Sequence, residues 1–176
     1  MAELYPTSLK LSELKVPPSA GERYLLDRLS NTLSDDFEVY FKPVFNGEVI
    51  DVVVLRKGCG VVLITVRDWN LREVTLDDDG QWADPVAGEP LIAPNQQVKG
   101  CKWNMFNLHI SGLVEKAALN ENFQKVVHPF VFFYQSTKQD INALCGPVEE
   151  TMRQGRAQLI GQHKKKEIND QKYKEP

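Results

Sequence analysis

Hydrophobic and polar positions follow different periods along the chain, and these periods divide its first part into one helix and three strands. Residues 19–33 repeat leucines at helical spacing, with Ser19 in the N-cap position, and predict a helix. Residues 37–44 alternate hydrophobic and polar side chains, as a half-buried strand does. Residues 49–56 and 60–67 are almost continuously hydrophobic, which is typical of strands covered on both faces. The short turn between them predicts a hairpin.

The same patterns predict further elements in the second half of the chain. Residues 72–82 indicate a weak hairpin around a polar DDDG turn. A helix is predicted from Pro94 to residue 114, because hydrophobic residues recur at helical spacing and proline is favoured in the first helical turn. Residues 125–135 predict an internal strand, with Pro129 at its start, at an edge or at a bulge.

The length of the chain fits one domain with a substantial core. Its 176 residues lie within the usual domain size of about 100 to 200 residues. Two short helices are predicted at residues 137–146 and 147–161, and the end of the chain is polar, with three consecutive lysines. We therefore predict an N-terminal segment at residues 1–14, a folded domain at 15–160, and a polar basic tail or linker at 161–176.

Charge and cysteine content limit the classes of function. Charged residues make up 26% of the chain and the net charge is −3, so no global basic field favours nucleic acid, and any such binding must be local. The three cysteines form no metal-binding or disulfide pattern, which favours a reducing cytoplasm. Neither a signal peptide nor a run of roughly 20 hydrophobic residues is present. We expect a cytoplasmic protein with no membrane partner.

Three polar residues interrupt the hydrophobic strands and indicate a site. Asp51 is the only charge within residues 49–55, where an unpaired carboxylate would be costly. Thr65 and Arg67 are two residues apart in the next strand, and they therefore project from the same face. If the two strands pair as a hairpin, these three side chains can converge at one end of the sheet.

Four separated motifs occur in order along most of the chain. They are a helix that begins with SAGE, an isolated aspartate in a hydrophobic strand, a following strand GVVLITVRDW, and PNQQ at the start of a helix. Together, over roughly residues 15 to 135, they resemble the nuclease-related domain family of the PD-(D/E)XK nuclease-like superfamily. The resemblance implies an α/β (α+β) fold with a restriction-endonuclease-like core, in which helices flank a central mixed β-sheet.

The resemblance also implies a function and a set of site residues. It matches Glu22 and Asp51 to carboxylates that hold a metal, Trp69 to an aromatic position, and Gln97, or Gln96 with a shift of one, to a glutamine that opens the next helix. Such a site holds Mg²⁺ or Mn²⁺, which polarises a phosphate and activates a bound water. The implied activity is a nuclease acting on single- or double-stranded DNA, in DNA processing such as repair, with a helicase module in the same or another chain.

The chain departs from the family pattern where that pattern has Glu-x-Lys. Thr65 supplies a neutral oxygen in place of a carboxylate, which weakens a hard-cation site. Arg67 stays protonated and cannot act as a base, although it can bind a phosphate or a carboxylate. We therefore expect a degenerate phosphodiesterase site. Two hypotheses remain open: a weak or altered metal-dependent nuclease, and an inactive module that binds nucleic acid or a partner protein.

Each candidate residue also has a purely structural explanation. Glu22 with Ser19 forms the capping-box sequence S-x-x-E. Asp51 with Arg67 would form an ion pair in the space that a metal would take, and Thr65 is simply a good strand former. The two glutamines suit a first helical turn. The three tryptophans are expected to pack in the core or at a sheet edge rather than to stack on bases.

Overall fold

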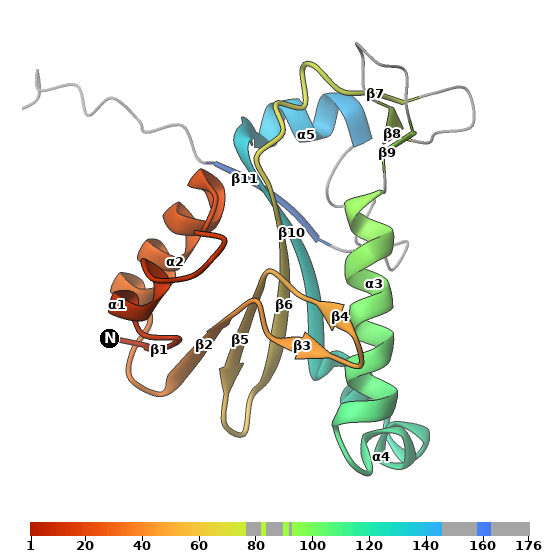
Figure 1. Ribbon diagram of the computed structural model, residues 1–176. Coiled ribbons are helices and arrows are strands. Elements are labelled where there is room, and N and C mark those ends of the chain that lie inside the picture. The colour runs from red at the N-terminus through yellow and green to blue at the C-terminus, as the bar shows by residue number, and fades with distance from the viewer. Residues whose placement is uncertain (77–81, 84–89, 92, 146–157, 163–176) are drawn as a thin grey trace, which may run out of the picture.

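A six-stranded mixed sheet forms the centre of the computed structural model, which describes residues 1–76, 82–83, 90–91, 93–145 and 158–162 (Figure 1). The strands lie in the order β1, β2, β5, β6, β10 and β11. Their bounds are Glu3–Tyr5 for β1, Phe37–Phe41 for β2, Val52–Arg56 for β5, Gly60–Arg67 for β6, Val127–Thr137 for β10 and Gln158–Gln162 for β11. β2, β5 and β6 pair antiparallel, whereas β1, β10 and β11 join in parallel. The predicted central mixed sheet is confirmed.

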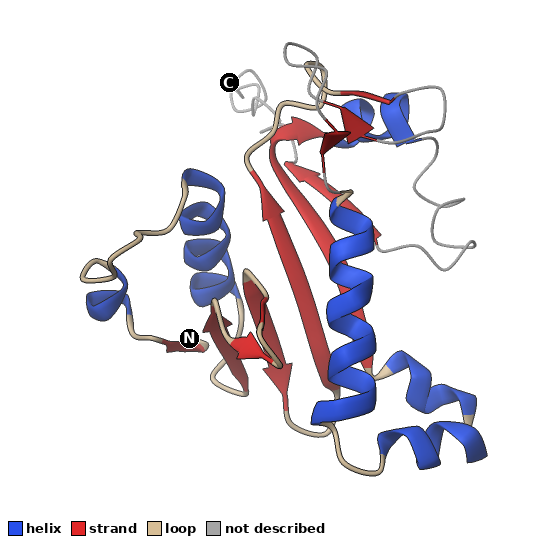
Figure 2. Cartoon of the chain, turned by 45° about the vertical axis from the view of Figure 1, so that its right-hand side comes forward, coloured by secondary structure: helices blue, strands red, loops and turns tan. Residues whose placement is uncertain are grey.

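Helices cover both faces of this sheet, as Figure 2 shows. On one face α2 (Ala20–Thr32) buries Leu26 in a cluster that includes Val66. On the other face α3 (Pro94–Asn104) buries Val98 in a second cluster that includes Leu63. The remaining helical segments are α1 (Ser8–Leu11), η1 (Met105–His109), α4 (Leu113–Leu119), η2 (Glu121–Lys125) and α5 (Lys138–Cys145). The short strands are β3 (Val44–Phe45), β4 (Glu48–Val49), β7 (Thr75–Leu76), β8 (Trp82–Ala83) and β9 (Pro90–Leu91).

β6 is hydrophobic along its length because it is covered on both faces. Ile64 and Val66 belong to the cluster beneath α2, and Leu63 belongs to the cluster beneath α3. By the alternation of a strand, Thr65 and Arg67 lie on the α3 face with Leu63. Burial of each large aliphatic side chain is worth about 1.5–3 kcal/mol, so this strand contributes strongly to the core. The two polar residues are therefore carried on a rigid element.

Most of the predicted elements are confirmed. Ser19 is the N-cap of α2, and the hairpin of β5 and β6 forms as expected. The predicted internal strand is β10, and Pro129 lies near its start, one residue before Phe130, where pairing with β11 begins. The helix predicted at 137–146 is α5. β7 and β8 pair antiparallel, while the DDDG turn between them lies outside the described residues.

Two helix predictions are corrected by the structure. The helix predicted to run to residue 114 changes to a π-helical turn, η1, and ends at His109, because Gly112 then turns the chain with φ +70° before α4 begins. The helix predicted at 147–161 is wrong at its end, because residues 158–162 form β11. Their hydrogen bonds to the open edge of β10 outweigh the local helical spacing. Residues 147–157 and 163–176 lie outside the described residues.

β1 is an element that the hydrophobic pattern did not predict. Residues 3–5 pair in parallel with β2, and the rings of Tyr5 and Tyr40 stack with their centroids 4.9 Å apart. The boundaries placed at residues 14 and 160 stay predictions. Among the described residues, no helix is long and hydrophobic enough to cross a membrane.

Candidate functional site

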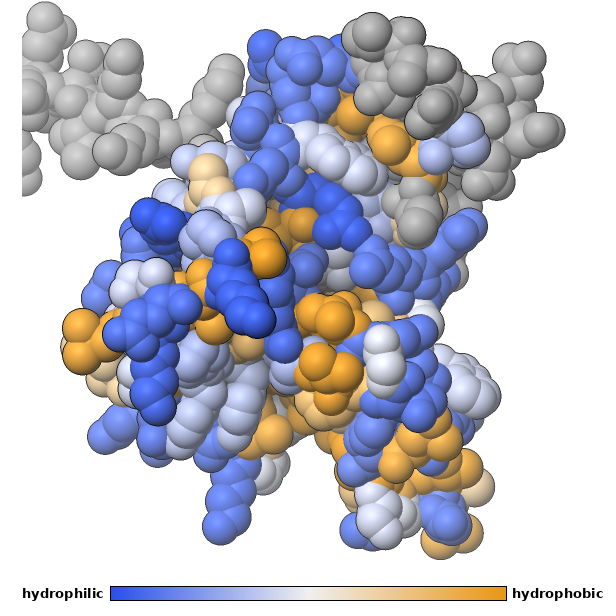
Figure 3. All heavy atoms as spheres, viewed as in Figure 1, coloured by the Kyte–Doolittle hydropathy of each residue, from blue (hydrophilic) through white to orange (hydrophobic). Residues whose placement is uncertain are grey.

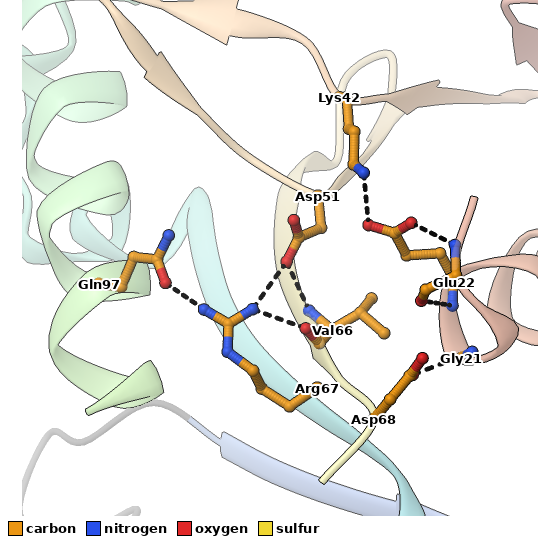
Figure 4. Close-up of polar contacts among 9 residues, drawn as sticks. Gly21, Glu22, Lys42, Asp51, Val66, Arg67, Asp68 and Gln97 are labelled. Atoms are coloured by element: carbon orange, nitrogen blue, oxygen red, sulfur yellow. Dashed lines mark hydrogen bonds and ion pairs between the residues drawn. The ribbon is translucent and has the colours of Figure 1, made fainter. Parts of the chain in front are cut away.

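Arg67 lies at the end of β6 and is held by acceptors on three sides (Figure 4). Its Nη1 donates to the backbone oxygen of Val66 at 2.6 Å and to Oδ2 of Asp51 at 3.3 Å. Its Nη2 donates to the side-chain oxygen of Gln97 at the start of α3. The guanidinium carbon lies 5.6 Å from the ring centroid of Trp69, within reach of a cation–π interaction. These contacts fix the guanidinium in one orientation.

Asp51 takes two donors on one carboxylate oxygen. Oδ2 accepts the backbone N–H of Val66 at 2.8 Å in addition to Arg67. The contact with Arg67 is a single one, and the two side chains are 17% and 20% exposed. Burial raises the pKa of Asp51 above its ordinary value, against the lowering effects of the Val66 N–H and of Arg67, and the carboxylate of Glu22 raises it further. The Val66 N–H and Arg67 therefore offset only part of the free-energy cost of burying the ionised Asp51 carboxylate.

Glu22 is a buried carboxylate, 8% exposed, that faces a different cation. Its Oε2 accepts the backbone N–H of Ser19 at 2.8 Å, and Oγ of Ser19 accepts the backbone N–H of Glu22 at 3.2 Å. The capping-box explanation is confirmed. Its other oxygen, Oε1, lies 3.0 Å from the ammonium of Lys42. Figure 4 shows Glu22 and Asp51 side by side, each directed at its own cationic side chain.

Lys42 and Asp68 belong to this site, although neither was among the predicted residues. The backbone of Lys42 donates to the backbone oxygen of Asp51 at 2.9 Å, which sets its side chain beside Glu22. Asp68 accepts the backbone N–H of Gly21 at 3.0 Å and thereby ties the start of α2 to the end of β6. The sequence signal for Asp68 is its place in the motif GVVLITVRDW, directly after the end of the strand.

The structure brings the predicted residues together unevenly. Asp51, Arg67 and Gln97 form one connected group of hydrogen bonds. Glu22 lies close enough to this group that its negative charge raises the pKa of Asp51. Thr65 is 2% exposed and pairs in register with Val131 inside the sheet, which is where a strand-forming residue packs.

This donor set does not fit a divalent cation. Asp51 already binds an N–H and a guanidinium through one oxygen, and Glu22 binds an N–H and an ammonium through its two oxygens. Thr65 is neutral and adds no negative charge to the site. Within the part of the chain that the structure describes, no group of three or more His, Cys, Asp or Glu side chains could hold a metal ion. Two positive charges of the protein occupy the place where Mg²⁺ or Mn²⁺ was expected.

Comparisons with known proteins add a distant structural likeness. No family model matches the chain, and no curated protein matches it. Among solved structures the chain is similar to one described as the crystal structure of a repair endonuclease from Pyrococcus abyssi, with 12% sequence identity and a TM-score of 0.35. The match covers 86% of this chain and 49% of the other, so the chain spans about half the length of that protein. A likeness at this level carries no conclusion about activity.

Proposed function

We propose that this chain is a nuclease-related DNA-processing domain whose phosphodiesterase site is closed, and that it binds DNA without cleaving it. The observation that carries this proposal is the contact of Arg67 with Oδ2 of Asp51, on the face and at the strand end where the family pattern has a metal-binding carboxylate and a lysine. A guanidinium supplies positive charge there but keeps its proton at physiological pH. Arg67 can stabilise the fold through its ion pair, or bind a phosphate, but it cannot deprotonate water.

The electrostatics of the two carboxylates support the same proposal. A divalent cation would have to displace Arg67 from Asp51 and Lys42 from Glu22, and each displacement would leave a partly buried charge without its partner. Thr65 offers no charge to compensate for that loss. Metal-dependent hydrolysis therefore has no favourable route through the arrangement of these side chains.

A second candidate is a weak phosphodiesterase in which Glu22 and Asp51 hold Mg²⁺ or Mn²⁺ and Arg67 stabilises charge on the phosphate. One observation favours it. The two carboxylates are close enough for Glu22 to raise the pKa of Asp51, and the single contact of 3.3 Å between Asp51 and Arg67 is long for a charge-assisted hydrogen bond. An added cation would relieve the repulsion between the carboxylates.

A cleavage experiment separates these two candidates. Labelled single- and double-stranded DNA would be incubated with Mg²⁺ or Mn²⁺ and with the native chain, Asp51→Ala, and the double variant Thr65→Glu with Arg67→Lys. The closed site predicts no cleavage by the native chain and cleavage only after the double restoration. Cleavage by the native chain that is lost in Asp51→Ala would overturn the proposal in favour of the second candidate. Asp36→Ala is the matched control, because its carboxylate pairs with Arg56 at the exposed end of β5.

A helicase module in the same or another chain stays part of the proposal, on the resemblance alone. Tethering to a motor that opens strands would raise the local concentration of DNA around this domain. That arrangement suits a chain whose net charge of −3 gives no long-range attraction to DNA.

A further inference from the structure

A groove separates α3 from α4, outside the group around Arg67. It encloses about 480 Å³, within the range of roughly 300–1,000 Å³ that is common for ligand pockets. Its lining includes Lys99, Lys102, Trp103, Phe106, Asn107 and Gln124, and none of the described residues that line it is acidic. In Figure 3 hydrophobic residues gather on the surface over α4, at the lower right. The groove therefore combines hydrophobic walls with positive charge.

Trp103 is the most unusual residue of this groove because it is 62% exposed. The expectation that all three tryptophans pack in the core or at a sheet edge is wrong for Trp103, whereas Trp82 is buried as expected. Trp103 follows Lys99 by four residues on α3, so the two side chains lie on the same side of the helix, and Phe106 of η1 lines the same groove. A large indole left in water on a folded helix offers a flat surface on which an aromatic ligand can stack.

Lys99 and Lys102 give the groove its charge. They are three residues apart on α3, so they lie on the same side of the helix. Burial lowers the pKa of Lys102, and the neighbouring charge of Lys99 lowers it further. Among the described residues, no acidic side chain forms an ion pair with either lysine. An anionic ligand would relieve the repulsion between the two ammonium groups.

The backbone of the groove is also irregular. Phe106 and Asn107 belong to η1, the π-helical turn at the end of α3. Such turns are rare and occur frequently at functional sites. The side-chain amide of Asn107 donates to the backbone oxygen of Trp103 at 2.7 Å, which leaves the amide oxygen of Asn107 as an acceptor, and Gln124 adds a second exposed amide.

We propose that this groove binds single-stranded DNA, with a base stacked on Trp103 and backbone phosphates on Lys99 and Lys102. Aromatic side chains beside a positive groove are the usual means of binding single strands, because each unpaired base presents a face for stacking. The absence of acidic groups from the described lining favours phosphate over a basic peptide. The choice of DNA as the ligand rests on the proposed function above. The place of binding and the preference for single strands come from the groove itself.

The test is anisotropy of a fluorescein-labelled oligo(dT) strand, titrated with the native chain, with Trp103→Ala, and with the double variant Lys99→Gln and Lys102→Gln. We expect about 5- to 150-fold weaker binding for Trp103→Ala, since stacking of one base contributes about 1–3 kcal/mol. The lysine variant should bind more weakly and reduce the slope of log affinity against log salt by about 1.4, which is two phosphate contacts. Lys10→Gln with Lys57→Gln is the control of equal charge change, because both lysines are exposed outside the groove.

The possible results distinguish failure of the groove inference from failure of the proposed function. If the native chain binds oligo(dT) and the groove variants bind as well as the control, the groove inference is wrong while the proposed function stands. If a duplex binds the native chain as tightly as the single strand does, the preference for single strands is wrong. If the native chain binds no DNA, both proposals fail. If Trp103→Ala instead abolishes a dimer seen by sedimentation, the groove is a contact between copies and the inference is overturned.

Discussion

The carboxylate of Asp51 accepts the backbone N–H of Val66 at 2.8 Å, just beyond the last paired residues of β5 and β6. That pairing ends at Val52 and Ile64, where β5 begins. Beyond this point the side chain of Asp51 takes the place of a strand backbone and accepts a backbone N–H of β6. Asp51 thus has a structural role that does not depend on a metal. The same oxygen also receives Arg67, so strand geometry and ion pairing meet at one atom.

Replacement of Asp51 should test this role directly. Asp51→Ala leaves the Val66 N–H without its acceptor and Arg67 without its counter-charge, so we expect the free energy of unfolding to fall by about 1–3 kcal/mol. The larger loss of roughly 3–5 kcal/mol known for fully buried pairs is not expected, because both side chains are partly exposed. Asp51→Asn should lose less, since its amide oxygen can still accept the N–H.

Urea unfolding of the native chain and both variants measures these differences. Asp36→Ala is the control, since its exposed pair with Arg56 should change stability by less than about 0.5 kcal/mol. Equal stability of Asp51→Ala and the native chain would contradict the role of Asp51 as an acceptor for β6.

The free energy of unfolding should depend on pH as expected for a carboxyl group, that of Asp51, whose pKa is higher in the folded chain than in the unfolded chain. Because burial raises the pKa of Asp51 in the folded state, the folded chain binds this proton more tightly than the unfolded chain does. Relative to Asp51→Asn, the native chain should gain stability as pH falls from neutral through the raised folded pKa toward about 3.9, the unfolded value. The gain should level off below that pH. Paired urea titrations at several pH values measure it, and a native chain that loses stability relative to the variant over this range would contradict the raised pKa.

The sequence predicts the members of the site better than it predicts their contacts. The period of two in β6 places Thr65 and Arg67 on one face from local pattern alone, and the hairpin then brings Asp51 near them. Gln97 came from the family resemblance. The partnership of Glu22 with Lys42 depends on how α2 packs on the sheet, which no local pattern encodes.

The same limit explains the two strands that the hydrophobic pattern missed, whereas the exposure of Trp103 had a local signal. β1 and β11 are short and owe their strand conformation to the neighbours β2 and β10, which lie far away in sequence. Trp103 lies on the side of α3 opposite the buried Val98, Cys101 and Met105, so its helical spacing places it away from the sheet.

Two of the cysteines should differ sharply in reactivity. Cys59 is exposed in the turn between β5 and β6, whereas Cys101 is buried in α3. Burial first, and then the charge of Glu48, raises the pKa of Cys101 to about 11, so very little thiolate forms at neutral pH. We expect Cys59→Ser to remove a fast phase of reaction with a disulfide reagent, and Cys101→Ser to leave that phase unchanged. A fast phase that is lost in Cys101→Ser would show that Cys101 is open to solvent in the folded chain.

The start of α2 should tolerate no side chain at Gly21. A Cβ atom there would lie 2.0 Å from Oδ1 of Asp68 and 2.8 Å from Cβ of Tyr134, so α2 would have to move away from β6. We expect Gly21→Ala to lower the free energy of unfolding by about 1–3 kcal/mol, although alanine is the better helix former. The double variant with Asp68→Ala should recover only part of the loss, because the backbone-fixed Cβ of Tyr134 remains. Gly100→Ala, in α3 with no atom within 4 Å of the added methyl, is the control and should stabilise the chain by about 0.5–1 kcal/mol. Stability of Gly21→Ala equal to that of Gly100→Ala would mean that α2 does not approach β6 as closely as the contact between Gly21 and Asp68 requires.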